Sequence, residues 1–410
     1  MKKILIIGFV WPEPNSTAAG SRMMQLIELF QKEGYLIIFA STATKTENAF
    51  DLKKIGVETS EIKLNCVSFD QFVQNINPEI VLFDRYLTEE QFGWRVSENC
   101  PNALKILDTE DLHFLRNARQ TAHLKNMEVT FELLKNEIAK REIASIYRCD
   151  LTLIISKYEL KILKKVFNID KTLLQYVPFL LDPIDLKKIQ NYPLFKSRQH
   201  FITMGNFKHA PNWDSVQYLK STIWPLIREQ LPKAEMHIYG AYATDKVQQL
   251  NDKKKGFLIK GWAENKEEIF KTAKICLAPL QFGAGLKGKL IDAMNYGTPS
   301  VTSTIGAEAM HGKLKWNGFI CNNPEEFALK SVALYTNQEC WEEAQINGVE
   351  IINKCYSKEK YGQKLIKKVH FLTENLKKHR MTNFIGLMLE HHTLKSTKYL
   401  SKWIEEKNKK

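Results

Sequence analysis

Hydrophobic positions along the chain alternate between short continuous runs and amphipathic stretches. Continuous apolar runs of strand length occur at Ile4 to Phe9 and at Leu36 to Phe39, as in strands that are buried on both faces of a parallel sheet. Between them, apolar residues recur at helical spacing from Met23 to Phe30. Farther along, Ser156 and Glu159 have the spacing of a capping box at a helix start. The pattern predicts repeated strand–helix–strand units with a polar loop after each strand.

The alternation breaks down once, near the middle of the chain. The segment VPFLLDPIDL contains Pro178 and Pro183, and regular patterning resumes only after Ser197. Proline removes a backbone donor and interrupts both helices and ladders, so we place an interdomain linker here. A length of 410 residues fits two domains that are each large enough to fold alone. We therefore predict an α/β protein with domains at residues 1–180 and 181–355.

Composition narrows the class of protein. Hydrophobic residues make up 44% and charged residues 26% of the chain, which is typical of a soluble globular protein. The seven cysteines include no Cys-x-x-Cys pair and no spacing with histidine that suits zinc, so we read them as core residues in a reducing compartment. The apolar run at Ile4 to Phe9 is too short for a signal peptide or a membrane span. We expect a cytoplasmic protein.

The stretch from Ile275 to Met310 carries the clearest candidate chemistry. A strand-length apolar run is followed by the loop FGAGLKGK, a short amphipathic helix and a second strand. Glycines allow a ligand to approach the backbone, and the N–H groups at a helix start favour an anion. Lys287 and Lys289 add two cations there, and Asp292 follows within the helix as an acceptor for sugar hydroxyls. This combination suits a ligand with phosphates beside a ribose, although an ordinary turn with solvated lysines has the same spacing.

A second cluster follows a predicted strand in the first half. In LDTEDLHFLRNARQ, four ionisable residues crowd one strand-to-helix connection, namely Asp108, Asp111, His113 and Arg116. Burying so many ionisable groups is costly unless each is paired, so we expect them to line a polar cleft. A lone histidine is more often a structural residue, and the functional reading depends on the cluster.

Both segments point to the same family. GAGLKGKLIDAMNYGTPSVTSTIGAE resembles the donor-binding signature of retaining GT-B glycosyltransferases of the family 4 (group 1) kind, in a bacterial branch with a Gly-Ala-Gly-x-Lys-Gly-Lys loop. DTEDLHFLR resembles an element of the same branch. The resemblance implies two Rossmann-like domains that face each other across a cleft. It also implies that the donor binds the second domain, that the acceptor binds the first, and that a helix at residues 356–375 returns to the first domain.

The resemblance also assigns further residues and exposes two departures. The polar loop after the first strand faces the donor diphosphate and the acceptor in the family, which makes Gly20 and Arg22 candidates, although an ordinary connecting loop is an equally good reading of Arg22. The loop GNFKH lacks the arginine that usually grips the donor phosphates. Relatives place two acidic residues eight positions apart, whereas this chain has Ala284 and Asp292. The contacts of the donor sugar are therefore in doubt, and Glu308 is read as either a family position or a solvated loop residue.

We predict a metal-independent retaining glycosyltransferase that moves a sugar from a nucleotide-sugar to a hydroxyl acceptor, a glycan or a lipid-linked saccharide, in the synthesis of cell-surface polysaccharide. A nucleotide-sugar 2-epimerase of the same fold and a non-catalytic nucleotide-sugar-binding subunit are the alternatives. No cofactor is expected. The candidate residues are Asp111, His113, Lys287 and Lys289 for catalysis, Gly205, Asn206, Lys208, Gly283, Gly285, Gly288 and Asp292 for the donor, and Gly20, Arg22 and Arg116 on the acceptor side.

The net charge of +13 is concentrated at the C-terminus. Residues 354–410 hold 15 Lys or Arg and 5 Asp or Glu, so this stretch carries +10. Within it, residues 376–410 form a basic amphipathic tail that either lies on an anionic membrane surface, at the inner face of the membrane, or packs against the body of the protein or is partly disordered. We expect no nucleic-acid partner, because no recognised binding motif accompanies the charge.

Overall fold

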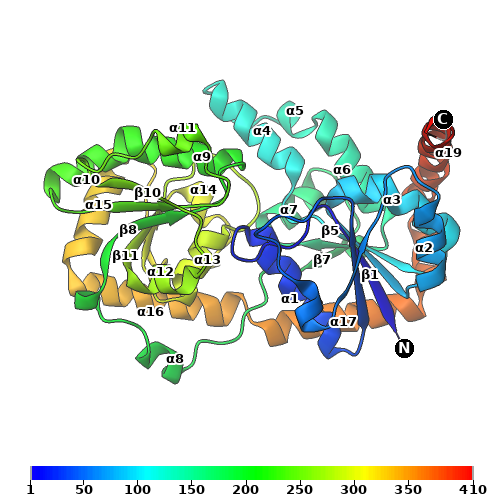
Figure 1. Cartoon of the computed structure of the whole chain (residues 1–410), viewed down its shortest axis with the longest axis horizontal. Helices are drawn as coiled ribbons and strands as arrows, with labels where there is room; N and C mark the ends of the chain where they lie inside the picture. The colour runs from blue at the N-terminus through cyan, green and yellow to red at the C-terminus, as the bar shows by residue number, and fades with distance from the viewer. Residues whose placement is uncertain (1, 409–410) are drawn as a thin grey trace.

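The computed structural model describes residues 2–408, apart from the side chains of residues 392–395. Figure 1 shows two α/β halves side by side, each built on one parallel sheet. Side chains alternate between the faces of each strand, so Ile4 and Ile6 enter one core cluster and Leu5 and Ile7 enter another on the opposite face. The structure confirms the predicted α/β class with two Rossmann-like domains.

The first domain has a seven-stranded sheet in the order β3-β2-β1-β4-β5-β6-β7. Its strands are β1 (Lys3–Gly8), β2 (Leu36–Ser41), β3 (Glu58–Glu61), β4 (Ile80–Asp84), β5 (Leu104–Asp108), β6 (Leu151–Ile154) and β7 (Leu174–Tyr176). Its helices are α1 (Ala18–Lys32), α2 (Ser68–Ile76), α3 (Arg85–Asn99), α4 (His113–Leu124), α5 (Phe131–Leu134), α6 (Glu137–Arg148) and α7 (Lys157–Lys165).

The second domain has a six-stranded sheet in the order β10-β9-β8-β11-β12-β13. Its strands are β8 (Gln199–Met204), β9 (Met236–Tyr239), β10 (Phe257–Gly261), β11 (Ala273–Ala278), β12 (Ser300–Thr302) and β13 (Gly318–Ile320). Its helices are α9 (Ala210–Tyr218), α10 (Trp224–Gln230), α11 (Asp245–Gln248), α12 (Lys266–Thr272), α13 (Gly288–Asn295), α14 (Thr304–Ala307), α15 (Pro324–Thr336) and α16 (Gln338–Cys355).

The chain passes between the domains twice. The first passage, after β7, contains only the short α8 (Leu186–Gln190) and one 3-10 turn before β8. The second follows α16, where Leu181 and Ser357 form an isolated bridge. The helix α17 (Lys358–Glu374) then packs against the first domain, because Leu365, Val369 and Leu372 join a core cluster of that domain. Figure 1 shows α17 running beneath the first domain.

The C-terminal region continues as α18 (Leu376–Thr382) and α19 (Phe384–Lys407). The helix α19 packs on α3 and α6 of the first domain. Two ion pairs join α19 to this domain: Lys105 of β5 pairs with Glu390, and Arg95 of α3 pairs with Glu405. Within the predicted tail at 376–410, residues 409–410 and the side chains of residues 392–395 lie outside the described part of the chain.

Strand order changes direction at a defined point in each sheet. In the first sheet, β1 pairs with both β2 and β4, and in the second, β8 pairs with both β9 and β11. Open parallel sheets bind ligands beyond the carboxyl ends of the strands at such switch points. We therefore expect the functional site at the carboxyl ends of β1 and β4 in the first sheet and of β8 and β11 in the second.

Candidate active site

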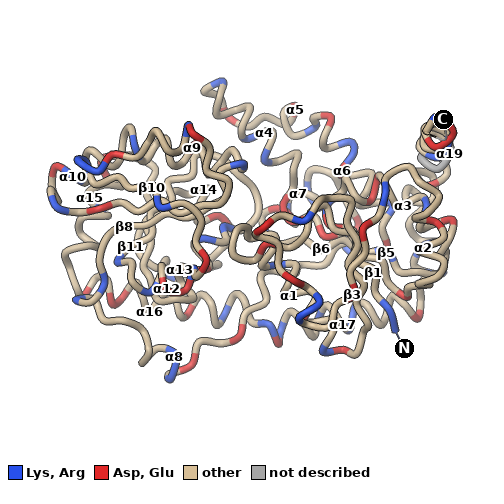
Figure 2. Tube along the Cα trace, in the orientation of Figure 1, with Lys and Arg blue, Asp and Glu red and all other residues tan. Residues whose placement is uncertain are grey.

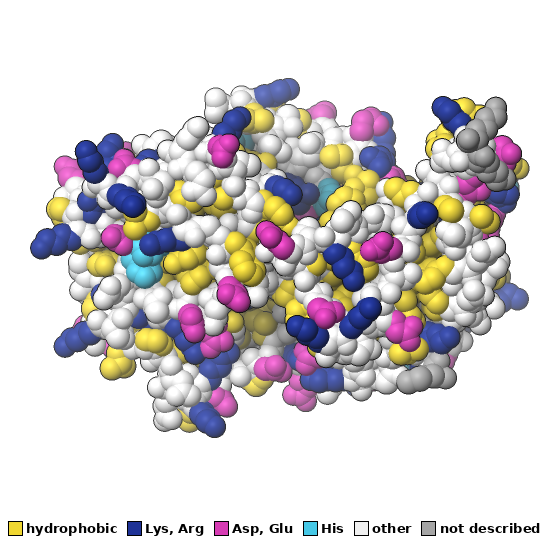
Figure 3. All heavy atoms as spheres, in the orientation of Figure 1, with side chains coloured by type: hydrophobic (Ala, Val, Ile, Leu, Met, Phe, Trp, Pro, Cys, Tyr) yellow, Lys and Arg dark blue, Asp and Glu magenta, His cyan; other side chains and the backbone are white. Residues whose placement is uncertain are grey.

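A cavity of about 560 Å³ lies between the two domains. Its walls include Phe9, Arg85 and Glu110, which follow β1, β4 and β5, and Gly205 and Leu280, which follow β8 and β11. Both switch points therefore open into the same cavity. Figure 3 shows the surface hollowed between the two halves, with basic side chains inside.

All but two of the predicted site residues line this cavity. Those from the second domain are Gly205, Asn206, Lys208, Gly283, Gly285, Lys287, Gly288, Lys289 and Asp292, and those from the first domain are Asp111, His113 and Arg116. The exceptions are Gly20 and Arg22.

Glycine is required at two positions of the 283–288 loop. Gly285 has a φ of +64°, and a Cβ added there would lie 2.9 Å from the Cβ of Asp111 in the first domain. A Cβ at Gly288 would lie 2.6 Å from the Cβ of Ala18, at the start of α1. Any larger residue would therefore push the domains apart. The N-termini of α13 and α1 meet at this cavity, and two helix starts at one cavity favour an anion.

Two lysines stand at the N-terminus of α13. Lys287 is the N-cap residue, 9% exposed, and its Nζ donates to the carbonyl oxygens of Ala284 at 3.1 Å and Gly285 at 2.8 Å. The Nζ of Lys289 donates to Oδ1 of Asn212 at 2.9 Å. Burial lowers the pKa of each lysine to about 8. No side chain caps α13, so its first N–H groups are available beside these cations.

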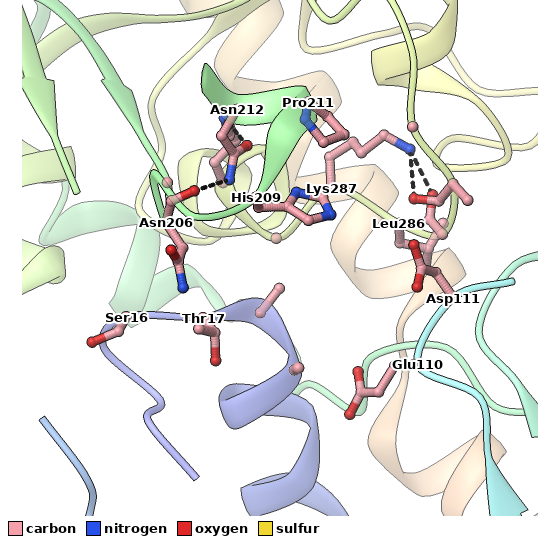
Figure 4. A pocket seen from close by; sticks show the side chains of 18 of the residues that line it. Ser16, Thr17, Glu110, Asp111, Asn206, His209, Pro211, Asn212, Leu286 and Lys287 are labelled. Atoms are coloured by element: carbon pink, nitrogen blue, oxygen red, sulfur yellow. Dashed lines mark hydrogen bonds between the residues drawn. The ribbon is translucent and has the colours of Figure 1, made fainter. Parts of the chain in front are cut away.

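The loop after β8 supplies a further edge of the cavity. Asn206 accepts from the backbone N–H of Lys208 through Oδ1 at 2.8 Å, and its carbonyl accepts from Nδ2 of Asn212 at 3.0 Å. The exposed Lys208 places its Nζ 3.8 Å from the centre of the Tyr242 ring. Figure 4 shows Asn206, Asn212, His209 and Lys287 on one side of the cavity, opposite Ser16 and Thr17. The second-domain side is thus rich in hydrogen-bond donors and cations.

The first-domain side carries ionised and neutral groups next to each other. Asp111 pairs with Arg116 and lies 3.5 Å from Nε2 of His113. Burial opposes the charge of Asp111, but Arg116 and the two nearby histidines outweigh it and lower the pKa of Asp111. Burial lowers the pKa of His113 to about 4. At neutral pH, the site therefore holds a carboxylate at 111 and a neutral imidazole at 113.

Asp292, which lines the cavity, forms an ion pair with Lys266. Lys266 of α12 donates to Oδ2 of Asp292 at 3.2 Å and also reaches the carbonyl of Pro14 at 3.4 Å and Oγ of Ser21 at 3.3 Å. Lys266 therefore links α13 to the first domain. Sequence reasoning did not propose Lys266, because its role depends on the contact between domains.

Two predictions need correction. Arg22 lies within α1, is 1% exposed, and donates from Nη2 to Oδ1 of Asp108 at 2.9 Å and from Nη1 to the carbonyl of Val177 at 2.7 Å. Arg22 and Asp108 thus form a buried pair outside the cavity instead of facing a ligand. Gly20 is also within α1, where an added Cβ would clash with the backbone of Glu13 at 2.5 Å. Its role is to let the preceding loop fold back onto the helix.

Two buried residues of the first domain hold the glycine loop. Oε1 of Glu159 accepts from the N–H of Gly285 at 2.8 Å and from that of Leu112 at 3.0 Å. Nη1 of Arg119 donates to the carbonyl of Gly283 at 2.8 Å. Burial, together with Asp111, raises the pKa of Glu159 to about 7. Ser156 caps α7 as predicted, but the capping-box interpretation of Glu159 is wrong, because its carboxylate reaches the other domain.

Arg119 also pairs with Glu308 of the second domain, from Nη2 to Oε1 at 2.6 Å. Glu308 is therefore a partner across the domain interface and not a solvated loop residue. Among the described residues, no group of three or more His, Cys, Asp or Glu side chains is arranged to hold a metal ion.

Residues 198–337 match the family model described as glycosyl transferases group 1. The second domain is of the group 1 glycosyltransferase type. The matched range contains the loop after β8, the glycine loop and both lysines. A comparison with curated protein sequences finds no match for this chain.

Solved structures share the architecture of the whole chain at low sequence identity. A mutant of Staphylococcus aureus TarM in complex with fondaparinux, α-GlcNAc-glycerol and UDP is 13% identical, with a TM-score of 0.67 over 90% of this chain and 100% of that one. Sucrose-phosphate synthase from Thermosynechococcus elongatus is 14% identical, with a TM-score of 0.65 over 91% and 99%. Anabaena HepE in complex with UDP and glucose is 11% identical, with a TM-score of 0.62 over 90% and 100%. The chain has the GT-B fold.

Proposed function

We propose that this chain is a retaining glycosyltransferase that moves a sugar from a nucleotide-sugar to a hydroxyl acceptor. One observation carries the proposal: Lys287, Lys289 and the uncapped N-terminus of α13 all face a cavity whose opposite wall holds carboxyl groups beside arginines. This arrangement separates a phosphate-binding side from a hydroxyl-binding side. The group 1 match of residues 198–337 supports the assignment of the donor to the second domain.

The leaving diphosphate gives these cations their role. Transfer breaks the bond between the anomeric carbon and the phosphate oxygen, forms a bond to the acceptor oxygen, and passes the acceptor proton to the departing phosphate. Negative charge therefore grows on the diphosphate in the transition state. Lys287, Lys289 and the N–H of Gly288 would stabilise it as preorganised donors, with the exposed Lys208 as a further cation. We propose that no metal is needed, and unchanged turnover in the presence of a chelator is the expected result.

The polar residues of the first domain would position the sugar and the acceptor. Asp111 is a fixed carboxylate, and His113 is a neutral imidazole that can accept or donate one hydrogen bond. Asp292, held by Lys266 at 3.0 Å, lies one turn into α13 and is the candidate for the ribose hydroxyls. We also propose that the acceptor is a glycan or a lipid-linked saccharide and that the reaction belongs to the synthesis of cell-surface polysaccharide.

A panel of UDP-, GDP-, ADP- and dTDP-sugars tests the proposal. We expect one nucleotide class to raise the midpoint of thermal unfolding, since a ligand that binds only the native state stabilises it. That donor is then incubated with and without saccharide acceptors and the products are identified. Transfer that needs an acceptor supports the proposal. Epimerised sugar from the donor alone identifies a 2-epimerase, and binding with no reaction identifies a non-catalytic subunit.

We also propose that α19 lies on an anionic lipid surface. Phe384, Met388, Tyr399 and Trp403 are exposed and share one face of the helix, whereas Glu390, Ser401 and Glu405 on the opposite face contact the first domain. Exposed Lys402 and Lys407 accompany these apolar side chains on the outer side of α19, and exposed apolar side chains with adjacent basic residues are typical of a helix that binds an anionic membrane surface. The charge of +10 over residues 354–410 suits anionic lipid. No helix in residues 2–408 is both long and apolar enough to cross a bilayer.

Vesicle flotation tests this surface. We expect the protein to float with vesicles of phosphatidylglycerol and phosphatidylcholine, and not with phosphatidylcholine alone. The double variant F384S/W403S should lose flotation and keep its unfolding midpoint, because both side chains are already exposed. Equal flotation of the variant would contradict the proposal. Elsewhere basic and acidic residues are interspersed over both domains (Figure 2).

A further inference from the structure

Two residues that are not glycine adopt left-handed backbone conformations at the cavity. Arg85 has a φ of +72° and Glu110 a φ of +61°, and both line the cavity. They follow neighbouring strands, since β4 and β5 pair in register at Asp84 and Asp108. Such conformations are costly for residues with a Cβ, and they cluster where function over-determines the backbone. The same kind of strain at two adjacent strand ends therefore calls for a functional explanation.

Both side chains also lack hydrogen-bond partners within the described residues. Oε1 of Glu110 is buried and makes no hydrogen bond. Arg85 is 17% exposed, and its contacts are Oδ1 of Asp84 at 3.8 Å and the Phe9 ring, whose centre is 5.2 Å away. Leaving a buried carboxyl oxygen without a hydrogen bond is expensive. Figure 4 shows the Glu110 side chain directed into the cavity, where a ligand could supply the missing partners.

The charges around Glu110 indicate what kind of ligand fits. Asp84 at the end of β4 and Asp108 at the end of β5 act on it, together with Arg22 from α1 and Arg85 from α3. Burial, Asp108 and Asp84 raise the pKa of Glu110 well above its usual value, against the two arginines. Asp108 is already neutralised by Arg22, and Asp84 lies beside Arg85. The corner is thus balanced without a charged ligand, and it presents unpaired groups that suit hydroxyls.

We propose that Phe9, Arg85 and Glu110 form a specificity-determining subsite for an uncharged saccharide acceptor, in which the carboxyl group of Glu110 binds a hydroxyl. Phe9 is 38% exposed and offers an apolar ring to a sugar face. The carbonyl of Glu110 lies 3.6 Å from the position of a Cβ at Gly285, so the subsite adjoins the donor loop. This inference rests on the proposed function, because the saccharide bound here is the one that would accept the transferred sugar.

Thermal unfolding provides a test that needs no substrate. Glycine adopts positive φ without strain, and Glu110→Gly also removes the unpaired carboxyl group. We expect this variant to have a higher unfolding midpoint than the wild type. The matched exchange of an exposed glutamate, Glu128→Gly, should not raise it. A midpoint of Glu110→Gly at or below that of the wild type would show that Glu110 stabilises the fold, and would overturn the inference.

Glycan binding tests the ligand class. The protein, loaded with the nucleoside diphosphate that stabilises it most, is applied to an array of neutral and acidic glycans. We expect binding to neutral glycans, retained by Glu110→Gln, and at least a tenfold loss in Glu110→Ala and Arg85→Ala with nucleotide binding unchanged. Preference for acidic glycans, undiminished binding by both alanine variants, or no glycan bound would overturn the inference, and failure to bind any nucleotide would overturn the proposed function instead.

Discussion

The two walls of the cavity are built in opposite ways. The second-domain wall presents Lys287 and Lys289 beside a helix N-terminus, all from one short stretch of chain. The first-domain wall presents Arg85, Glu110 and Asp111 from the ends of separate strands. In the proposed function, the cationic second-domain wall binds the phosphates of the donor, and the first-domain wall, which combines carboxyl groups with arginines, binds the hydroxyls of the acceptor. We call them the donor wall and the acceptor wall. The difference shows how a two-domain enzyme can hold a charged donor and a polyhydroxylated acceptor against each other.

The largest expected effect comes from removing the cations of the donor wall. We expect Lys287→Ala or Lys289→Ala to lower kcat by a factor on the order of 100, or about 3 kcal/mol in the barrier, as for other preorganised donors to a developing anion. Lys313→Ala, an exposed lysine of the same domain, is the matched control and should keep full turnover. Steady-state kinetics with the stabilising donor measure the effect. A normal kcat with unchanged donor affinity in both cavity variants would remove the assignment of these lysines.

The contact between the two walls should matter next. Arg119 of the first domain donates hydrogen bonds to two groups of the second domain, the carbonyl of Gly283 and the carboxylate of Glu308. Arg119→Met removes these hydrogen bonds and leaves Glu308 without its partner, so we expect the free energy of unfolding to fall by about 2 kcal/mol and kcat to fall as the loop loses its position. Chemical denaturation and kinetics measure the two effects. Full activity in this variant would show that the loop does not depend on the first domain.

Near neutral pH, the smallest expected effect is a pH dependence of donor binding. The pKa of Lys287 and of Lys289 is lowered by burial to about 8 in the free protein. Each lysine loses its proton, and hence its positive charge, as the pH rises through that value. Donor affinity should therefore decline above pH 8, by about tenfold per pH unit for each cation that must be reprotonated on binding. Calorimetric titrations between pH 7 and 9.5 measure this decline, and constant affinity across that range would contradict the charges assigned to the donor wall.

The same contrast explains what could be read from the sequence. The donor wall comes from one continuous segment, so glycines, lysines and helical spacing marked Gly283 to Asp292 in advance. The strand runs likewise predicted the two α/β domains, because parallel strands that are buried on both faces read as continuous apolar stretches.

The acceptor wall could not be read in this way. Phe9, Arg85 and Glu110 are far apart in the sequence and become neighbours only when β1, β4 and β5 pair. Their only sequence signal is a position directly after a strand. Arg22 misled the prediction because a buried ion pair and a ligand-binding arginine look alike in a loop sequence, and only its contact with Asp108 distinguishes them. Glu159 and Arg119 form hydrogen bonds across the domain interface. A contact between domains cannot be predicted from a local sequence pattern.

A crystal structure with the nucleoside diphosphate that most stabilises the protein tests the central claim most directly. The account predicts phosphate oxygens within hydrogen-bond distance of the Nζ atoms of Lys287 and Lys289 and of the backbone N–H of Gly288. Phosphates bound elsewhere, with both lysines still turned onto Ala284, Gly285 and Asn212, would contradict it.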